Sequence, residues 1–403
     1  MAAKPWIPVL AEGPRALAET TLLKILFAVQ NFRQGWGGAP ESVRLMANQL
    51  SELGVTADVF DAGRVRHAVG DLTILPEAGS AADAFAYADT RDYSAILLTG
   101  PWQNAVSIGR LLSHRRQGQK LFYLPRGGLG KVEFSRSRDL KKVPYLSLIE
   151  RRFIDASNGV IFSSQVEQRE TVKTARGRTW EHIIPDFVGL GAPINLTPEP
   201  DLNVVTFAFL AEISPRKGLH LLVEAFTAWV VESGLGDRAR QIVGGAPRPG
   251  CEAYLDAIRD AHSPHADRVK IEFRGAVPHG QRGAFYAETD VMVIASSFES
   301  FGLTVIEALN EGCIVLSTPA VGALQYIPSR DGVIRLPTFD AVAMARGLDR
   351  AMTLALDWKR TRRAEQRLFS ERTVATINST ALQAWAELLN IRQDQAVAPK
   401  AST

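Results

Sequence analysis

The first half of the chain alternates short apolar runs with segments in which apolar residues recur at helical spacing. Apolar runs occupy residues 22–29, 55–60, 93–98 and 120–124, and helical patterns occupy residues 43–53 and 105–116. Strands that are apolar throughout are typical of a parallel sheet covered by helices on both faces. The pattern therefore predicts a doubly wound, Rossmann-like α/β domain.

The same alternation begins again near residue 204. Strand patterns occupy residues 204–210, 241–244, 269–273, 291–295 and 314–317, and helical patterns occupy residues 218–231 and 251–261. Between the two series, residues 185–200 contain four prolines together with Gly189 and Gly191, a composition typical of a linker. We therefore predict an α/β protein with two doubly wound domains facing a central cleft, and place the boundary at residue 197.

The predicted domains are residues 1–197 and 198–374. A helical pattern over residues 375–391 follows the last strand, and we expect this helix to pack back on the first domain. Residues 392–403 contain Pro, Ala, Ser and Gln, and we expect a disordered tail.

Composition narrows the protein class. The 403 residues are 46% hydrophobic and 22% charged, which is typical of a folded globular protein, and the net charge is only +3. A charge this small argues against nucleic acid as the main partner. The two cysteines lack zinc-ligand spacing, and no apolar run is long enough for a signal peptide or a membrane span. We therefore expect a cytoplasmic protein.

The stretch 298–312 is the most informative one, because it directly follows the strand pattern that ends at residue 295. Its helix is expected to begin near Gly302 and to end at Gly312. The free amides of Gly302, Leu303 and Thr304 would then lie at the carboxyl edge of the sheet, where helix dipoles attract phosphate. Gly302 would allow a diphosphate to approach the backbone closely.

Two glutamates frame this helix start. Glu299 precedes it and Glu307 lies inside it, so both can line one cavity. Carboxylates are good acceptors for paired hydroxyl groups, whereas the helix start suits phosphate. A nucleotide sugar carries both kinds of group.

These residues resemble the signature of glycosyltransferase family 4, the group 1 family of retaining GT-B enzymes. Two glutamates separated by seven residues surround Phe-Gly-Leu-Thr, and Lys217 in Ser-Pro-Arg-Lys-Gly matches the family's lysine. The family's arginine is replaced by Glu212, and Arg216 is the nearby cation that could compensate. Arg126 stands where many members have a histidine that touches the donor sugar, and it is not assigned a catalytic role.

The resemblance implies a role for each matching residue. Glu299 and Lys217 are the expected catalytic residues, with Glu299 on the donor sugar and neither glutamate acting as a nucleophile. Glu307 is expected on the ribose hydroxyls. The expected donor-binding residues are Arg216, Lys217, Gly302, Leu303, Thr304, Glu307, Gly37 and Gly38. No Asp-x-Asp pair occurs, so we expect neither a metal nor another cofactor.

The expected reaction moves a hexose from a UDP- or GDP-linked sugar to a glycolipid or polysaccharide, such as lipopolysaccharide or another cell-envelope glycan. Two alternatives remain open. One is a catalytically silent GT-B protein that binds a nucleotide or serves as a scaffold, which Glu212 and Arg126 motivate. The other is a sugar-nucleotide epimerase with the same donor site. The sequence does not identify the sugar, the base, the linkage or the acceptor.

Residues 110–152 hold twelve basic residues against three acidic ones, with aromatic and leucine residues between them. Such a surface suits an anionic membrane, at about 1 kcal/mol per basic residue near the lipid. We therefore expect a membrane contact on the inner face of the plasma membrane. A phosphorylated saccharide and nucleic acid are the alternative occupants of this segment.

Overall fold

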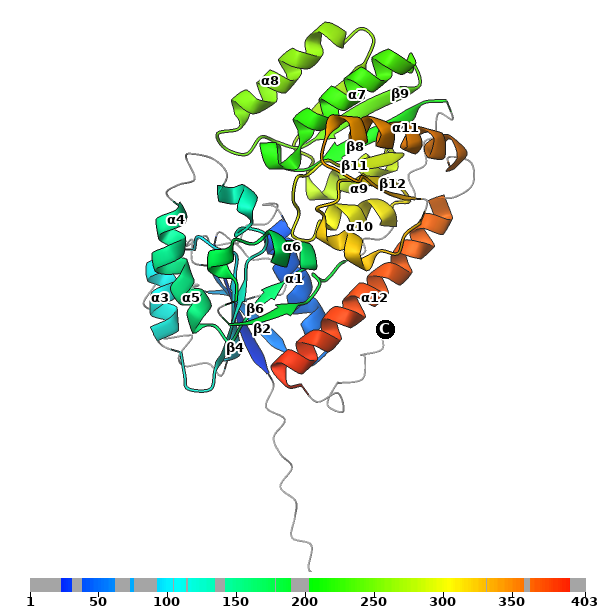
Figure 1. Ribbon diagram of the computed structural model, residues 1–403. Coiled ribbons are helices and arrows are strands. Elements are labelled where there is room, and N and C mark those ends of the chain that lie inside the picture. Colours follow the sequence, from blue (N-terminus) through cyan, green and yellow to red (C-terminus); the bar gives the residue numbers. More distant parts are fainter. Residues whose placement is uncertain are drawn as a thin grey trace, which may run out of the picture.

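The computed structural model describes residues 23–30, 38–61, 73–75, 93–189 and 203–391, apart from residues 104, 114, 135–141, 178, 331 and 359–362. Two α/β units follow one another along the chain, and a long C-terminal helix runs beside both of them (Figure 1). Residues 190–200 of the expected linker and the whole expected tail lie outside the described residues, so the position of the boundary stays a prediction.

The first unit is built on a seven-stranded sheet with the order β3-β2-β1-β4-β5-β6-β7. Each strand pairs with its neighbours in parallel. The strands are β1 (Lys24–Val29), β2 (Thr56–Asp61), β3 (Thr73–Leu75), β4 (Tyr93–Thr99), β5 (Lys120–Leu124), β6 (Gly159–Phe162) and β7 (Trp180–Ile183).

Helices cover both faces of this sheet. They are α1 (Gly38–Ser51), α3 (Ala105–Ser113), α4 (Lys142–Tyr145), α5 (Arg151–Ala156) and α6 (Gln165–Glu170), and a π-helical turn over Leu146–Glu150 joins α4 to α5. Alternate residues of β1 enter different cores: Ile25 and Phe27 pack with α1, whereas Leu26 and Ala28 pack with α3. Because a strand that is buried on both sides has no polar face, its sequence is a continuous apolar run.

The second unit has a six-stranded parallel sheet with the order β10-β9-β8-β11-β12-β13. Its strands are β8 (Val205–Leu210), β9 (Ala239–Gly244), β10 (Lys270–Gly275), β11 (Val291–Ile294), β12 (Ile314–Ser317) and β13 (Val333–Arg335). Its helices are α7 (Leu219–Ser233), α8 (Glu252–His262), α9 (Arg282–Ala287), α10 (Leu303–Asn310) and α11 (Ala341–Trp358).

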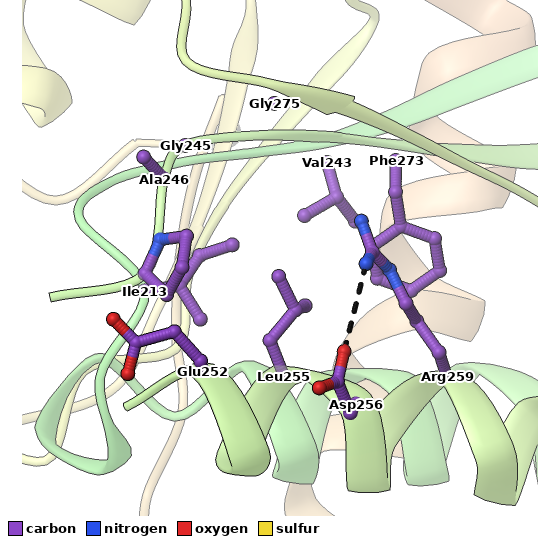
Figure 2. Close-up of a pocket in the computed structure, with 11 residues that line it drawn as sticks. Ile213, Val243, Gly245, Ala246, Glu252, Leu255, Asp256, Arg259, Phe273 and Gly275 are labelled. Atoms are coloured by element: carbon purple, nitrogen blue, oxygen red, sulfur yellow. Dashed lines mark ion pairs between the residues drawn. The ribbon is translucent and has the colours of Figure 1, made fainter. Parts of the chain in front are cut away.

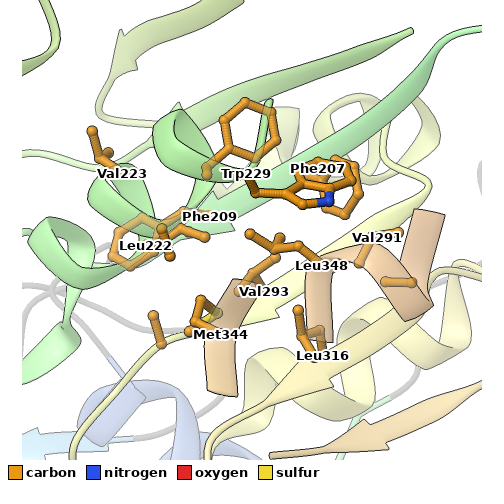
Figure 3. Close-up of a cluster of buried hydrophobic side chains, with 14 of the residues drawn as sticks. Phe207, Phe209, Leu222, Val223, Trp229, Val291, Val293, Leu316, Met344 and Leu348 are labelled. Carbon is orange, nitrogen blue, oxygen red and sulfur yellow. The ribbon is translucent and has the colours of Figure 1, made fainter. Parts of the chain in front are cut away.

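The core of the second unit is rich in aromatic residues. Phe207 on β8 packs edge-on against Phe226 and Trp229 of α7, with ring centroids 5.6 and 5.5 Å apart (Figure 3). Leu348 and Met344 of α11 complete this layer and are fully buried. The two doubly wound units confirm the predicted fold class.

The C-terminal helix α12 (Arg363–Leu389) starts earlier than the predicted residue 375. The sequence pattern did not predict these first turns, because several residues that they bury are polar. These residues are Gln366, Ser370 and Thr373. The first half of α12 packs on α10, whereas Trp385 enters the first unit's core 6.4 Å from the Phe122 ring. The helix therefore packs against both units.

Candidate functional site

Three loops meet at the carboxyl edge of the second sheet, after β8, β11 and β12. The Ser297 amide donates to the carbonyl of Arg216 at 2.9 Å, and the Glu299 amide donates to the carbonyl of Ala320 at 2.9 Å. Gly218 makes the first of these approaches possible. It has φ +70°, and a Cβ there would lie 1.9 Å from the carbonyl oxygen of Ala295. Only glycine fits such a position.

The Lys217 ammonium contacts the Glu299 carboxylate directly. The hydroxyl of Ser296 donates to the same carboxylate at 2.6 Å. Arg216 Nη1 donates to the carbonyl of Phe298 at 2.8 Å and lies 3.4 Å from Glu299 Oε2. The sequence-predicted residues Arg216 and Lys217 from the loop after β8 and Glu299 from the loop after β11 are therefore neighbours in space.

The ionisation of Glu299 follows from these neighbours. Burial alone would raise its pKa, but the charges of Lys217 and Arg216 and the hydrogen bonds to Lys217 and Ser296 lower it to about 2. Burial lowers the pKa of Lys217, and the Glu299 carboxylate opposes that shift. Glu299 is therefore an anion at neutral pH, which suits it to stabilise positive charge and not to donate a proton.

The start of α10 lies beside this ion pair. Gly302 has φ +96° and is the cap residue of the helix, as the sequence predicted. A Cβ at Gly302 would lie 3.7 Å from Cβ of Glu299 and 2.9 Å from the Val321 side chain. The amides of Leu303 and Thr304 in the first turn have no acceptor within the helix. This end of α10 therefore has the polarity of an anion site.

Glu307 lies further along α10 and has different partners. The Tyr286 hydroxyl donates to it at 2.6 Å, and Arg282 Nη1 lies 3.7 Å away. Burial and the Glu307 charge raise the pKa of Tyr286 well above its ordinary value, so the phenol stays a donor. Glu307 keeps 27% of its side chain exposed and can accept further hydrogen bonds.

A pocket of about 310 Å³ opens at the carboxyl ends of β9 and β10 (Figure 2). Ile213 from the loop after β8 lines it, so the pocket adjoins the loop that carries Lys217. Phe273 and α8 residues Glu252, Asp256 and Arg259 form its other walls. One clue to this pocket is visible in the sequence, the glycine turn at 244–247. Gly245 has φ +146°, and a Cβ there would lie 1.9 Å from the carbonyl oxygen of Ala211.

Comparison with known proteins finds a family match in the second unit. The model of glycosyl transferases group 1 matches residues 204–353, the segment that holds Lys217, Glu299 and Glu307. This segment is therefore similar to the group 1 glycosyltransferases. A curated relative, a phosphatidylinositol N-acetylglucosaminyltransferase subunit from Arabidopsis thaliana, is 24% identical over 245 residues, or 60% of the chain. The chain spans about half the length of that relative, 51%.

Solved structures share the fold of this chain over most of its length. Sucrose-phosphate synthase from Thermosynechococcus elongatus superposes with a TM-score of 0.68 at 20% identity, covering 92% of this chain and 100% of that one. HepE from Anabaena, solved in complex with UDP-glucose, has a TM-score of 0.62 at 17% identity, covering 91% and 100%. These likenesses confirm the GT-B fold.

The first domain approaches the carboxyl edge of the second sheet through residues 126–133. A Cβ at Gly130 would lie 2.8 Å from the Phe298 ring, and Glu133 lies 3.5 Å from Arg216 Nε. Ser164 Oγ donates to the carbonyl of Ser300 at 2.5 Å. The two domains therefore meet beside the Lys217–Glu299 pair.

Two residues that depart from the family pattern have defined partners. Arg126 lies buried at the end of β5 and forms an ion pair with Asp186, which links β5 to the segment after β7. Burial lowers the pKa of Arg126 to about 10. Glu212, which replaces the family's arginine, lies 2.6 Å from Arg248 Nε.

Some of the predicted features lie elsewhere or outside the described residues. Gly37 is outside them, and Gly38 begins α1 in the first domain. Among residues 38–61, 93–189 and 203–391, with the gaps given above, no three His, Cys, Asp or Glu side chains gather closely enough to hold a metal. In the same part of the chain, no helix combines the length and apolar character needed to span a bilayer.

Proposed function

We propose that this glycosyltransferase moves a hexose from a nucleoside-diphosphate sugar to a lipid-linked or polysaccharide acceptor of the cell envelope, such as lipopolysaccharide. The observation that carries the proposal is the contact between Lys217 and Glu299 beside the open start of α10. In that arrangement the diphosphate accepts hydrogen bonds from the amides of residues 302–304 and pairs with the cations Arg216 and Lys217. UDP is the favoured carrier, because HepE, a structural neighbour, was solved with UDP-glucose.

During transfer the bond between the anomeric carbon and the diphosphate oxygen breaks, and its electron pair leaves with the nucleoside diphosphate. The acceptor hydroxyl forms the new bond on the same face, and its proton passes to the departing diphosphate. Lys217 and Arg216 stabilise the negative charge that develops on the leaving group. Glu299, an anion at neutral pH, stabilises the positively charged sugar without attacking it. These charges would serve without a metal.

Glu307 is proposed to accept hydrogen bonds from the ribose hydroxyls, next to its existing bond from Tyr286. The pocket beside Ile213 is proposed to hold the nucleobase. Glu307→Gln is expected to weaken donor binding by about 1.5–3 kcal/mol, the range for charge-assisted hydrogen bonds. Titration calorimetry with UDP, GDP and ADP and their sugars, with and without EDTA and divalent metal, measures this loss and identifies the base.

Tyr286→Phe is the matched control, because it removes the same internal hydrogen bond and leaves the carboxylate in place. An unchanged affinity in Glu307→Gln, or an equal loss in Tyr286→Phe, would exclude the ribose role. Product analysis of the transferred sugar with an acceptor panel then tests retention of the anomeric configuration.

A membrane contact is proposed on the outer side of α4 and α5. Val143 on α4 and Leu148 on the π-helical turn that follows it are 44% and 62% exposed. Arg151 and Arg152 begin the next helix, so this exposed segment is both apolar and basic. This combination suits an anionic lipid surface that presents a lipid-linked acceptor. The curated relative's name, which includes phosphatidylinositol, supports a lipid acceptor.

Co-sedimentation with phosphatidylglycerol vesicles tests this contact. Binding is expected to fall with added salt and with Leu148→Ser, and to persist in Trp180→Ser, a control at an exposed aromatic residue on β7. Equal binding to neutral vesicles, or no binding at all, would remove the membrane from the proposal.

A catalytically silent, nucleotide-binding protein is the second candidate, because Glu212 replaces the cation that family members carry there. Hydrolysis or transfer of a bound UDP-sugar distinguishes the two. An intact donor after prolonged incubation with every acceptor offered would favour the silent protein.

A further inference from the structure

The loop after β8 is joined to the loop after β9 by backbone hydrogen bonds. The Ile213 amide donates to the carbonyl of Ala246 at 2.8 Å, and the Arg248 amide donates back to the carbonyl of Ile213 at 2.9 Å. Ile213 and Pro247 thereby form a short parallel bridge. Glu212 and Arg248 are the residues on either side of this bridge, and their positions are fixed by it.

Glu212 is an unfavourable residue at an anion site. Burial lowers the pKa of Lys217, and the carboxylates of Glu299 and Glu212 both oppose that shift, so Glu212 lies within electrostatic reach of the Lys217 ammonium. An incoming diphosphate would therefore meet the repulsion of this carboxylate. Arg248 neutralises it, because Arg248 Nε lies 2.6 Å from Glu212 Oε1.

The cations at this edge differ in how readily they can exchange partners. Lys217 and Arg216 keep 16% and 20% of their side chains exposed and are paired with Glu299, with Arg216 also near Glu133. Arg248 keeps 42% exposed, and Glu212 keeps 46%. A pair so open to solvent is weak, so its arginine can turn to a phosphate at little cost.

We propose that Arg248 is a further cation of the donor-phosphate site and that Glu212 is the residue that positions it. This inference rests on the proposed nucleotide-sugar function. Before the donor binds, Arg248 cancels the Glu212 charge, and in the donor complex the guanidinium adds a contact to the diphosphate at the rim between Lys217 and the pocket. Position 212 holds a glutamate in place of the family's arginine, and Arg248 in the loop after β9 supplies the positive charge instead.

Calorimetric titration with UDP in the presence of EDTA tests the assignment. Arg248→Ala is expected to raise the Kd for UDP roughly three- to tenfold, since it removes a partly exposed cation and leaves Glu212 unneutralised. Adding Glu212→Gln to Arg248→Ala is expected to recover part of that loss, because the repulsive carboxylate is gone. Glu212→Gln alone is expected to change the Kd less than Arg248→Ala does.

Lys270→Ala is the matched control. Lys270 is an exposed cation paired with Asp237 at 3.2 Å, but it begins β10 and so lies at the opposite edge of the same sheet. The Kd of Lys270→Ala for UDP should equal that of the parent protein. Thermal melting checks that every variant is folded. If the parent binds UDP and Arg248→Ala binds it equally well, this inference is wrong while the proposed function stands. If the parent binds none of UDP, GDP and ADP, both fail.

Discussion

Two glutamates on either side of the domain contact, one fully buried and one with 13% of its side chain exposed, are held in opposite ways. Glu167 in the first domain is fully buried and accepts hydrogen bonds from the Gly127 amide at 2.5 Å and from the amide and hydroxyl of Ser163 at 2.7 and 2.8 Å. Glu299 in the second domain is paired with Lys217 and Arg216. Burial raises the pKa of Glu167, and the hydrogen bonds and Arg126 reverse this only in part. At Glu299 the cations lower it to about 2.

The difference separates a structural carboxylate from one at a binding site. The donors around Glu167 are Gly127 in the loop after β5 and Ser163 directly after β6. The backbone holds both in place, and Glu167 stabilises the loop after β5. The cations around Glu299 belong to side chains that can rotate toward a ligand. Under the proposed function, Glu299 would act as a counterion that holds Lys217 and Arg216 in place until the donor diphosphate binds them.

Lys217→Met should have the largest effect, because it removes the cation closest to Glu299. The surroundings of this carboxylate then become more similar to those of Glu167. Transfer or donor hydrolysis is expected to fall by at least about 100-fold, the scale for one lost charge-stabilising donor. The buried carboxylate also loses its closest cation, which lowers the free energy of unfolding by about 3 kcal/mol. Activity assays with UDP-sugars and urea unfolding measure the two effects.

Lys270→Met provides the control for Lys217→Met, since it removes an exposed lysine from the far edge of the sheet. Its activity and stability should stay within experimental error of the parent's. A folded Lys217→Met enzyme with near-parent activity would show that Glu299 and Lys217 are a structural pair like the Glu167 cluster.

The surroundings of Glu299 were largely predictable from the sequence. Strands buried on both faces give apolar runs, so β8 and β11 were placed from the sequence, and residues at their carboxyl ends must share one edge of a parallel sheet. That geometry brings Lys217 and Glu299 together although 82 positions separate them. The helix start at Gly302 followed from local glycine chemistry.

The surroundings of Glu167 were not predictable in the same way. β6 and β7 were not among the predicted strands, and the sequence gives no sign that the Glu167 carboxylate is fully buried. Its burial depends on the loop after β5, which is distant in sequence. The partner of Glu212 was missed for the same reason, because only the bridge between Ile213 and Pro247 brings Arg248 to it.

Glu167→Gln should have an intermediate effect, about 2 kcal/mol of lost stability, from one buried donor left unsatisfied. One carboxylate oxygen accepts from Gly127 and the other from Ser163, so the amide NH2 of glutamine must face a donor on one side. Urea unfolding measures the loss. Glu170→Gln on the same helix is the control, since Glu170 is partly exposed and should change stability by less than about 0.5 kcal/mol. An equally small change in Glu167→Gln would contradict the bracing role.

The smallest expected effect is a difference in acid sensitivity. The folded-state pKa of Glu299, about 2, lies below that of an unfolded glutamate, about 4.3. Glu299 therefore stabilises the fold above the unfolded pKa and loses this contribution as the pH falls toward the folded one. The stability gap between the parent and Glu299→Gln should narrow by about 1 kcal/mol between roughly pH 6 and pH 3.5.

Glu167 should respond with the opposite sign. Its folded-state pKa is raised, so its contribution is fully present below the pKa of an unfolded glutamate and is lost as the pH rises through the folded value. The gap between the parent and Glu167→Gln should therefore widen as the pH falls. Urea unfolding followed by tryptophan fluorescence at several pH values across the same acid range measures both gaps in one series. If the two gaps move in the same direction, the cations around Glu299 do not set its ionisation, and the distinction between the two glutamates is lost.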